Sequence, residues 1–328
     1  MGWYDRSRSA ACVFSLMKGT AVGAQKASWK VVPQMKKLRC ALCAALLLFL
    51  CLSCACAEGV ITPLPVDDSA GPVVNPSFYL DDNHYKDPSI EVTIETYPWE
   101  KTVCYVARVS IADPSQLRTS SAYGFNRKQV ASVQDMANRM NAVVAVNGDY
   151  SYFQLSTVGC YLVRQGVSYC ERLAPGRDLL IVDEKGDMTI LRECTQEKLA
   201  QYDGPAIVNT FNFGPGLVVD GEPLVDNYRA MFNSSTTRNQ RAAICQVEKG
   251  KLEYVLAACE GDWESEGGGL TMREWSDFLM TLGVQNAYNL DGGNSTAIIF
   301  RGEKINAVQS KYHRKLSDII YFASAYQE

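Results

Sequence analysis

The feature that most constrains the fold is a succession of short apolar segments separated by tight turns. Lys185-Gly186, Asp220-Gly221 and Lys249-Gly250 each lie between two such segments. A residue followed by glycine at this position is typical of a two-residue β-hairpin turn. The pattern therefore predicts hairpins along much of the chain and leaves little room for long helices.

Predicted strands occupy most of the chain from residue 90 onward, because apolar residues alternate or cluster there in short runs. The runs are residues 90–97, 102–112, 142–146, 161–169, 179–191, 206–213, 216–225, 241–258, 284–290, 297–308 and 316–325. Some of these runs hold a turn, and so each of those runs predicts a hairpin rather than a single strand.

Two segments have helical spacing instead. One face of residues 121–140 carries Val130, Val133, Met136, Ala137 and Met140. In residues 267–283, Thr271 is a good N-cap, Glu274 lies at the capping-box position and Gly283 is a stop signal. Strands thus dominate, and nothing repeats at a fixed period. The sequence predicts an α+β fold, with strand-rich mixed sheets and a few helices in a single domain, over a doubly wound sheet.

The N-terminal region is organised differently. Residues 35–57 read MKKLRCALCAALLLFLCLSCACA, a basic start, an apolar run and an A-x-A end, which is the layout of a secretory signal peptide. Residues 1–34 are then a mis-annotated start or an extension. Residues 58–89 are expected to form an N-terminal arm or linker, and residues 90–328 the domain. A genuine extension with an uncleaved anchor and a lipidated cysteine are the alternatives.

Removal of residues 1–57 would change the charge of the chain. They carry 8 of the 32 Lys and Arg residues and one of the 36 Asp and Glu residues, which leaves 24 against 35 and a formal charge of −11. A chain this acidic is a poor partner for nucleic acid or anionic lipid. We therefore expect a secreted or cell-surface protein with no nucleic-acid partner and no stable membrane association after cleavage.

Two stretches share one plan and are expected to carry the chemistry. In AVVAVNGDYSYF, residues 142–153, and VQNAYNLDGGNSTA, residues 284–297, an apolar strand runs into Asn and then into a glycine loop with one Asp. A strand end should hold Asp149 or Asp291 in place, and glycine lets a ligand approach main-chain N–H donors. Two carboxylates held in this way suit acid–base work on a glycosidic or phosphoester bond.

The residues around the two carboxylates are predicted to bind the substrate. Asn side chains can donate to sugar or phosphate oxygens, and short hydroxyl side chains add further donors. The predicted binding residues are Asn147, Gly148, Tyr150, Asn289, Gly292, Gly293, Asn294, Ser295 and Thr296. Either stretch alone is also an ordinary turn, so a purely structural role is the alternative.

Arginines and histidines bear on the phosphate and on metals. Arg241 precedes one predicted strand and Arg314 another, and a guanidinium can bind phosphate through two parallel hydrogen bonds. An arginine at a strand start is also often just a solvated end. The only histidines, His84 and His313, lie far apart in the sequence, so a histidine-built metal site is not expected.

The order of these motifs resembles the phosphodiester glycosidase family over roughly residues 100–325. The blocks are AVNGDY, FNFGPGLVVDGEPL, RNQRAAICQ, GGGLTMREWSDFLMTLGVQNAYNLDGGNSTAIIF and RKLSDIIYFA. The resemblance implies a secreted bacterial hydrolase that cleaves a sugar-1-phosphodiester in a glycan or a cell-surface polysaccharide. Many bacterial members are described as exopolysaccharide-related, and the implied partner is a carbohydrate phosphodiester.

Carried over by motif, Asp149, Asp291 and Arg241 are the implied catalytic residues, and Arg314 matches the arginine before the last strand of the family. Some positions depart from the family pattern: Gln240, Ala242 and Cys245 stand near Arg241, and Asn294 stands in place of a third glycine. These departures affect the expected substrate more than the reaction class.

Two other functions remain open at this point. The first is a metal-assisted phosphodiesterase that cuts the P–O bond, with both Asp side chains binding a hard cation such as Ca²⁺. The second is a non-catalytic polysaccharide-binding module. We expect that no cofactor is required, with Ca²⁺ as the alternative.

Overall fold

The computed structural model divides into two compact units, Met1–Glu58 and Gly59–Glu328, and every described residue belongs to the second. The described residues are 59–125, 129–149, 161–173, 175–224, 236–261, 268–306 and 314–327. The predictions for residues 1–58, the signal peptide included, lie outside them. No helix in the described part is both long and apolar enough to cross a membrane.

The largest sheet has eight strands in the order β13-β12-β16-β14-β15-β4-β3-β2. Its strands are β2 (His84–Lys86), β3 (Ile90–Trp99), β4 (Thr102–Ile111), β12 (Gly216–Val219), β13 (Glu222–Pro223), β14 (Arg241–Gln246), β15 (Glu253–Cys259) and β16 (Asn286–Leu290). The ladders are antiparallel, as hairpin-rich sequences predict.

A second sheet has five strands in the order β18-β17-β6-β19-β5. They are β5 (Leu117–Ser121), β6 (Val144–Asn147), β17 (Ile298–Phe300), β18 (Glu303–Lys304) and β19 (Asp318–Phe322). Its ladders are also antiparallel. The late strand β19 lies between β6 and β5, so the sheet joins residues that are far apart in the sequence.

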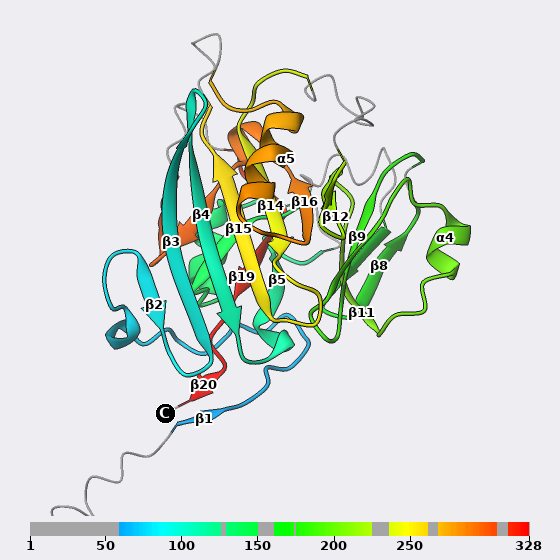
Figure 1. Cartoon of the computed structure of the whole chain (residues 1–328). Coiled ribbons are helices and arrows are strands. Elements are labelled where there is room, and N and C mark those ends of the chain that lie inside the picture. The colour runs from blue at the N-terminus through cyan, green and yellow to red at the C-terminus, as the bar shows by residue number, and fades with distance from the viewer. Residues whose placement is uncertain are drawn as a thin grey trace, which may run out of the picture. The chain divides into compact units, whose positions relative to one another are not determined.

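The remaining strands form small sheets beside these two (Figure 1). They are β7 (Tyr161–Arg164) with β8 (Val167–Glu171), and β9 (Leu179–Asp183) with β10 (Met188–Leu191) and β11 (Ile207–Phe211). The short helix α4 (Gln196–Ala200) lies near them. The first and last strands of this unit along the sequence, β1 (Val60–Ile61) and β20 (Tyr326–Gln327), pair with each other. The described residues also form the 3-10 turns η1 (Pro76–Phe78), η2 (Pro114–Gln116) and η3 (Gly293–Ser295).

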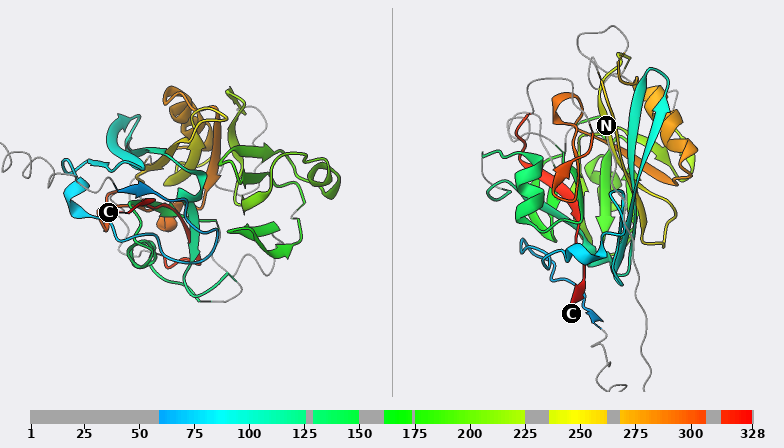
Figure 2. Two further views of the ribbon diagram at one scale, coloured as in Figure 1. Left: turned by 90° about the horizontal axis from the view of Figure 1, so that it is seen from below. Right: turned by 90° about the vertical axis from the view of Figure 1, so that its left-hand side faces the viewer.

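The two large sheets and two helices pack as four layers (Figure 2). Helix α5 (Met272–Thr281) covers the outer face of the eight-stranded sheet, where Trp275 and Phe278 are buried. Helix α2 (Val133–Arg139) covers the outer face of the five-stranded sheet with Met136. An apolar core lies between the sheets, and side chains from strands of both sheets form it. Along β6, β17 and β19 successive side chains point to opposite faces of the sheet, so these strands contribute both to the core between the sheets and to the layer under α2.

The strand predictions agree with the structure, and the chain is a strand-rich fold with a few helices. Helix α5 begins at the predicted N-cap, since Thr271 accepts from the Glu274 N–H and the Glu274 side chain accepts from the Thr271 N–H. The helix predicted over residues 121–140 was too long. Residue 121 ends β5, and the helix starts only after Ser132, whose side chain accepts from Asp135 N–H; Val130 is exposed. The spacing of apolar residues predicted a helix in this region, but the N-cap at Ser132 determines where it begins.

Candidate active site

Asp149 lies two residues past the end of β6, in a turn that packs on β19. Gly148 N–H donates to the main-chain oxygen of Asp318 at 3.0 Å, and Asp149 N–H donates to Asp318 Oδ1 at 3.2 Å. A Cβ on Gly148 would lie 2.3 Å from Asp318 Oδ1. The turn therefore needs glycine for close approach, which explains the Asn-Gly-Asp order.

The Asp149 carboxylate is buried and is held by main-chain donors. Asn212 N–H donates to Oδ2 at 2.7 Å and Phe213 N–H donates to Oδ1, both from the segment that follows β11. The side chain is only 2% exposed. Burial raises the pKa of Asp149 to about 6, although the nearby Arg164 guanidinium acts to lower it.

Asp291 follows β16 and starts a loop that folds over Gln240. Gly293 N–H donates to the Gln240 main-chain oxygen at 3.0 Å, and Gly293 has a φ of 60°. A Cβ on Gly292 would lie 2.5 Å from that same oxygen. The two glycines thus allow the loop to pack against Gln240, directly before the start of β14.

The Asp291 carboxylate lies among polar side chains at the edge of the interior. Ser295 Oγ donates to Asp291 Oδ2 at 2.7 Å, and Arg314 Nη1 lies 3.7 Å from the same oxygen. The residue is 7% exposed. Burial raises the pKa of Asp291 to about 6, and the negative charge of Asp149 raises it further, while Ser295 and Arg314 act to lower it.

Asn147 joins the two loops. Its Nδ2 donates to the main-chain oxygen of Asp291 at 2.7 Å, and its Oδ1 accepts from Ala297 N–H at 3.2 Å. Both polar ends of this buried side chain therefore bind main chain on either side of η3. The structure brings the two predicted stretches together, and it gives Asn147 a bridging position that its sequence did not reveal.

The two predicted arginines lie in different surroundings. The Arg314 side chain is 51% exposed, its N–H donates to Asn294 O at 3.1 Å, and its Nη1 lies 3.4 Å from Ser295 Oγ. Arg241 is buried, and its guanidinium donates to the main-chain oxygens of Leu270 and Thr237, each at 2.9 Å. Burial lowers the pKa of Arg241 to about 10. Arg314 is the one placed beside Asp291.

Several polar oxygens near the Asp291 loop are buried without a hydrogen-bond partner. In the described part of the chain, the atoms of this kind in or beside the loop are Gln240 Oε1, Asn289 Oδ1, Asn294 Oδ1 and Thr296 Oγ1. Asn289 is held at its other end, where Nδ2 donates to Gly214 O at 2.8 Å. Buried acceptors of this kind are normally satisfied, so a concentration of them is consistent with a ligand or water site. Tyr150 lies outside the described residues.

Three charged residues near Asp149 escaped the sequence interpretation. Arg164 and Asp318 form a buried ion pair, with Nη2 to Oδ2 at 2.9 Å. Arg177 lies close enough for the Asp149 charge to raise its pKa, although burial, the larger effect, lowers it. A signal was present: Arg164 lies within the run YLVRQG and Asp318 within LSDIIYFA, and a charge inside an apolar strand is rarely left unpaired.

Metal ligands do not gather in the described part of the chain, where no group of three or more His, Cys, Asp or Glu side chains could hold an ion. The partners found for Asp149 and Asp291 are N–H, O–H and guanidinium donors. Such an arrangement suits carboxylates that exchange protons at least as well as carboxylates that bind Ca²⁺.

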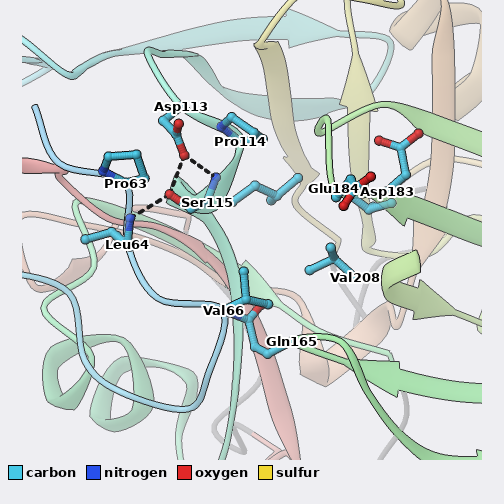
Figure 3. Close-up of a pocket in the computed structure, with 12 residues that line it drawn as sticks. Pro63, Leu64, Val66, Asp113, Pro114, Ser115, Gln165, Asp183, Glu184 and Val208 are labelled. Atoms are coloured by element: carbon cyan, nitrogen blue, oxygen red, sulfur yellow. Dashed lines mark hydrogen bonds between the residues drawn. The ribbon is translucent and has the colours of Figure 1, made fainter. Parts of the chain in front are cut away.

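A cavity of about 280 Å³ lies elsewhere in the fold (Figure 3). The N-terminal segment around Leu64 and Val66 forms one wall, and Glu184 and Val208 lie across from it. Ser115 closes part of the cavity, because its Oγ accepts from Leu64 N–H at 2.8 Å. Neither candidate carboxylate lines this cavity, so it is separate from the candidate site.

Comparison with known proteins finds a matching family profile and a curated relative. The profile described as phosphodiester glycosidase matches residues 140–323. The SPbeta prophage-derived uncharacterized protein YomE of Bacillus subtilis is 27% identical over 226 residues, which are 67% of this chain and 33% of that protein. This chain therefore spans about one third of the length of that curated relative.

A solved structure shares the fold, and a second gives a weaker match. The catalytic domain of zebrafish N-acetylglucosamine-1-phosphodiester alpha-N-acetylglucosaminidase, auto-inhibited by its pro-peptide, matches with a TM-score of 0.57 and 16% identity, over 80% of this chain and 98% of that one. A hypothetical protein from Synechocystis matches with a TM-score of 0.46 and 16% identity, over 71% and 62%. Since the profile covers more than half of the 328 residues, with Asp149 and Asp291 inside it, the chain belongs to the phosphodiester glycosidase family.

Proposed function

We propose that this protein is a secreted hydrolase that cleaves the glycosyl–phosphate bond of a sugar-1-phosphodiester in a glycan or cell-surface polysaccharide. The observation that carries the proposal is a pair of buried carboxylates, Asp149 and Asp291, with the half-exposed Arg314 beside the second. Family membership supports the reaction class. Residues 35–57 support export.

The environments of the two carboxylates suggest different roles. Asp149 accepts two main-chain N–H groups and lies near a buried guanidinium, which favours its charged form. Burial and the nearby charge of Asp149 favour the protonated form of Asp291, although Ser295 and Arg314 act against it. In the proposed reaction, Asp291 donates a proton toward the leaving phosphate oxygen, and Asp149 acts on the sugar as nucleophile or base.

Arg314 fits the phosphate. Its guanidinium is half exposed at the edge of the site, and it can form two parallel hydrogen bonds to phosphate oxygens. A phosphate monoester leaves more readily once its charge is balanced. Arg241 binds the main-chain oxygens of Leu270, ahead of α5, and of Thr237. It therefore supports the segment at Gln240 against which Gly292 and Gly293 pack.

The test uses residues 58–328, an N-acetylglucosamine-1-phosphodiester and ¹⁸O water, with mass spectrometry of the products. Label in the released sugar is the expected result, since it means that the C–O bond was cut. Label in the phosphate, together with loss of activity after chelation, would replace the proposal with a metal-assisted phosphodiesterase. Binding without turnover for a series of sugars would instead indicate a polysaccharide-binding module.

A matched pair of variants separates the site from the scaffold. Asp291→Asn should lose activity, whereas Asp87→Asn should retain it. Asp87 is also buried, but its Oδ1 accepts from Ser89 N–H and Ile90 N–H at the start of β3 and has no part in the candidate site. Equal activities for the two variants would remove Asp291 from the mechanism.

A further inference from the structure

Arg164, at the end of β7, is buried completely and is held on every side. Its Nε and Nη2 donate to Asp318 Oδ2 at 3.2 and 2.9 Å. Its Nη1 donates to the main-chain oxygen of Val163 at 3.1 Å and to that of Thr210. A buried guanidinium is costly unless it is paired and hydrogen-bonded, and this one meets both conditions.

Two aromatic rings fix the plane of the same guanidinium. Its Cζ lies 4.4 Å from the centre of the Phe211 ring and 5.9 Å from that of Phe125. Contacts at these distances are attractive between a cation and a ring face. Phe211 ends β11, directly before the main-chain N–H groups that bind Asp149. The arginine and the N–H donors are therefore parts of one packed unit.

Asp318 connects this arginine to the candidate site. One of its oxygens, Oδ2, takes the Arg164 hydrogen bonds, and the other, Oδ1, accepts from Asp149 N–H at 3.2 Å. Arg164 Nη2 also lies 3.8 Å from Asp149 Oδ2. The pair thus touches both the main chain and the carboxylate of Asp149.

The charged groups that face Asp149 come from four segments of the described chain. Arg164 stands on β7, Arg177 ahead of β9, Asp318 on β19 and Asp291 after β16. Arg164 opposes the two carboxylates from a position that solvent cannot screen. Its charge is therefore well placed to balance the negative charges gathered in the site.

We propose that Arg164, paired with Asp318, is a positioning residue that holds Asp149 in the orientation and the charged state required for attack on the sugar. The proposal rests on the function proposed above. Since its side chain is 0% exposed, Arg164 does not touch the substrate and acts through Asp149. Asp318 fixes the main chain of the turn, and Arg164 fixes Asp318 and supplies the positive charge.

Two variants and one control test the proposal. Arg164→Lys keeps a positive charge but loses the fork that binds Asp318. The double variant Arg164→Met with Asp318→Asn removes both charges together, which avoids leaving one of them buried alone. Arg118→Lys is the control, because Arg118 is equally buried but donates to the main-chain oxygens of Pro65, Asp67 and Ser69 instead.

The first measurement is the pH dependence of kcat and KM for the N-acetylglucosamine-1-phosphodiester. Arg164→Lys should lower kcat roughly 10- to 100-fold and leave KM within about twofold, because the substrate contacts persist. The acid limb of the profile should move up by about one pH unit. The lysine ammonium lacks the fork that binds Asp318, so it stabilises the charged form of the Asp149 carboxylate less well than the guanidinium does. Arg118→Lys should lower Tm and leave the limb in place. If Arg164→Lys gave only the Arg118→Lys result, Arg164 would be structural and the proposal overturned.

The second measurement needs no substrate, so it separates this proposal from the proposed function. The carboxyl carbon of Asp149 is titrated by ¹³C NMR and assigned by its absence in Asp149→Asn. An upward shift of its titration is expected in folded Arg164→Lys, and a smaller one in the double variant, which also loses the Asp318 charge that acts to raise the pKa of Asp149. An unchanged titration in Arg164→Lys would overturn the proposal. Absence of turnover by the wild type would count against the function, while a shifted titration would still support the positioning role.

Discussion

The loops of Asp149 and Asp291 share a sequence pattern but differ in how they hold a carboxylate. Asp149 is fixed by main-chain N–H groups and a fully buried arginine. Asp291 is fixed by the hydroxyl of Ser295 and lies near a half-exposed arginine. One sequence pattern therefore yields two carboxylates with different surroundings, one near a fully buried arginine and one near a half-exposed arginine.

The largest expected effect comes from removing each carboxylate in turn. Asp149→Asn and Asp291→Asn should each lower kcat by roughly 10²–10⁴-fold. A small external anion such as azide should restore turnover of Asp149→Asn, because it can replace a missing nucleophile on the sugar. It should not restore Asp291→Asn, because azide does not replace a proton donor to the phosphate. Measurement of sugar azide by mass spectrometry distinguishes the two. Rescue of Asp291→Asn alone would exchange the proposed roles.

Next in size is the loss of the exposed arginine. Arg314→Met should raise KM by about 10- to 100-fold, since a guanidinium–phosphate interaction is lost at the edge of the site. Arg301→Met is the matched control, because Arg301 is a partly exposed arginine paired with Asp82, 2.6 Å away. Steady-state kinetics with a sugar phosphodiester give both values. An equal change in the two variants would mean that Arg314 has no special place.

The two carboxylates should also destabilise the folded state at neutral pH. Each has a pKa of about 6 in the folded state against an ordinary value of 3.8. A folded state with the raised pKa binds protons more tightly, so stability is greatest below about pH 4 and falls as the pH rises toward 6. Asp291→Asn should therefore raise the free energy of unfolding on the order of 2 kcal/mol at pH 7.5. Urea unfolding should show that gain shrinking by pH 4; a gain that is constant with pH would exclude this cause.

The last prediction concerns the link between the two loops. Asn147→Ala removes two buried hydrogen bonds to main chain and should cost about 1–3 kcal/mol. Asn147→Asp keeps the acceptor for Ala297 N–H but loses the donor to Asp291 O, so it should be defective as well. Thermal unfolding followed by circular dichroism measures both. Stability equal to the wild type in both variants would mean that the loops do not depend on this bridge.

Much of the fold could be predicted from local sequence signals. Hairpin turns such as Lys185-Gly186 and the capping box of Thr271 and Glu274 act within a few residues, and both predictions agree with the structure. The pairing of β6 with β19 joins residues about 170 positions apart, and no local pattern specifies it. The short length of α2 had the same origin, because Ala131 forms a bridge with Leu316 instead of continuing a helix.

The candidate site could likewise be predicted from the sequence only where local signals mark its residues. Asp149 and Asp291 could be found because glycine and a preceding strand mark them in the sequence. Their association, and the bridge through Asn147, depends on two sheets meeting. Arg164 and Asp318 were missed because each is a single charge within an apolar run, and their meaning comes only from being neighbours. The catalytic role of every site residue stays a prediction until variants are measured.

The position of β19 has a consequence for the order in which this protein matures. Residues 318–322 fill the gap between β5 and β6, and Asp318 carries the turn that holds Asp149. A ribosome delivers these residues nearly 170 positions after the turn they support. Before these residues have left the ribosome, the chain lacks β19, which lies between β6 and β5. Pairing of strands so far apart in the sequence is slow. The turn that holds Asp149 is thus completed only after residues 318–322 have been synthesised.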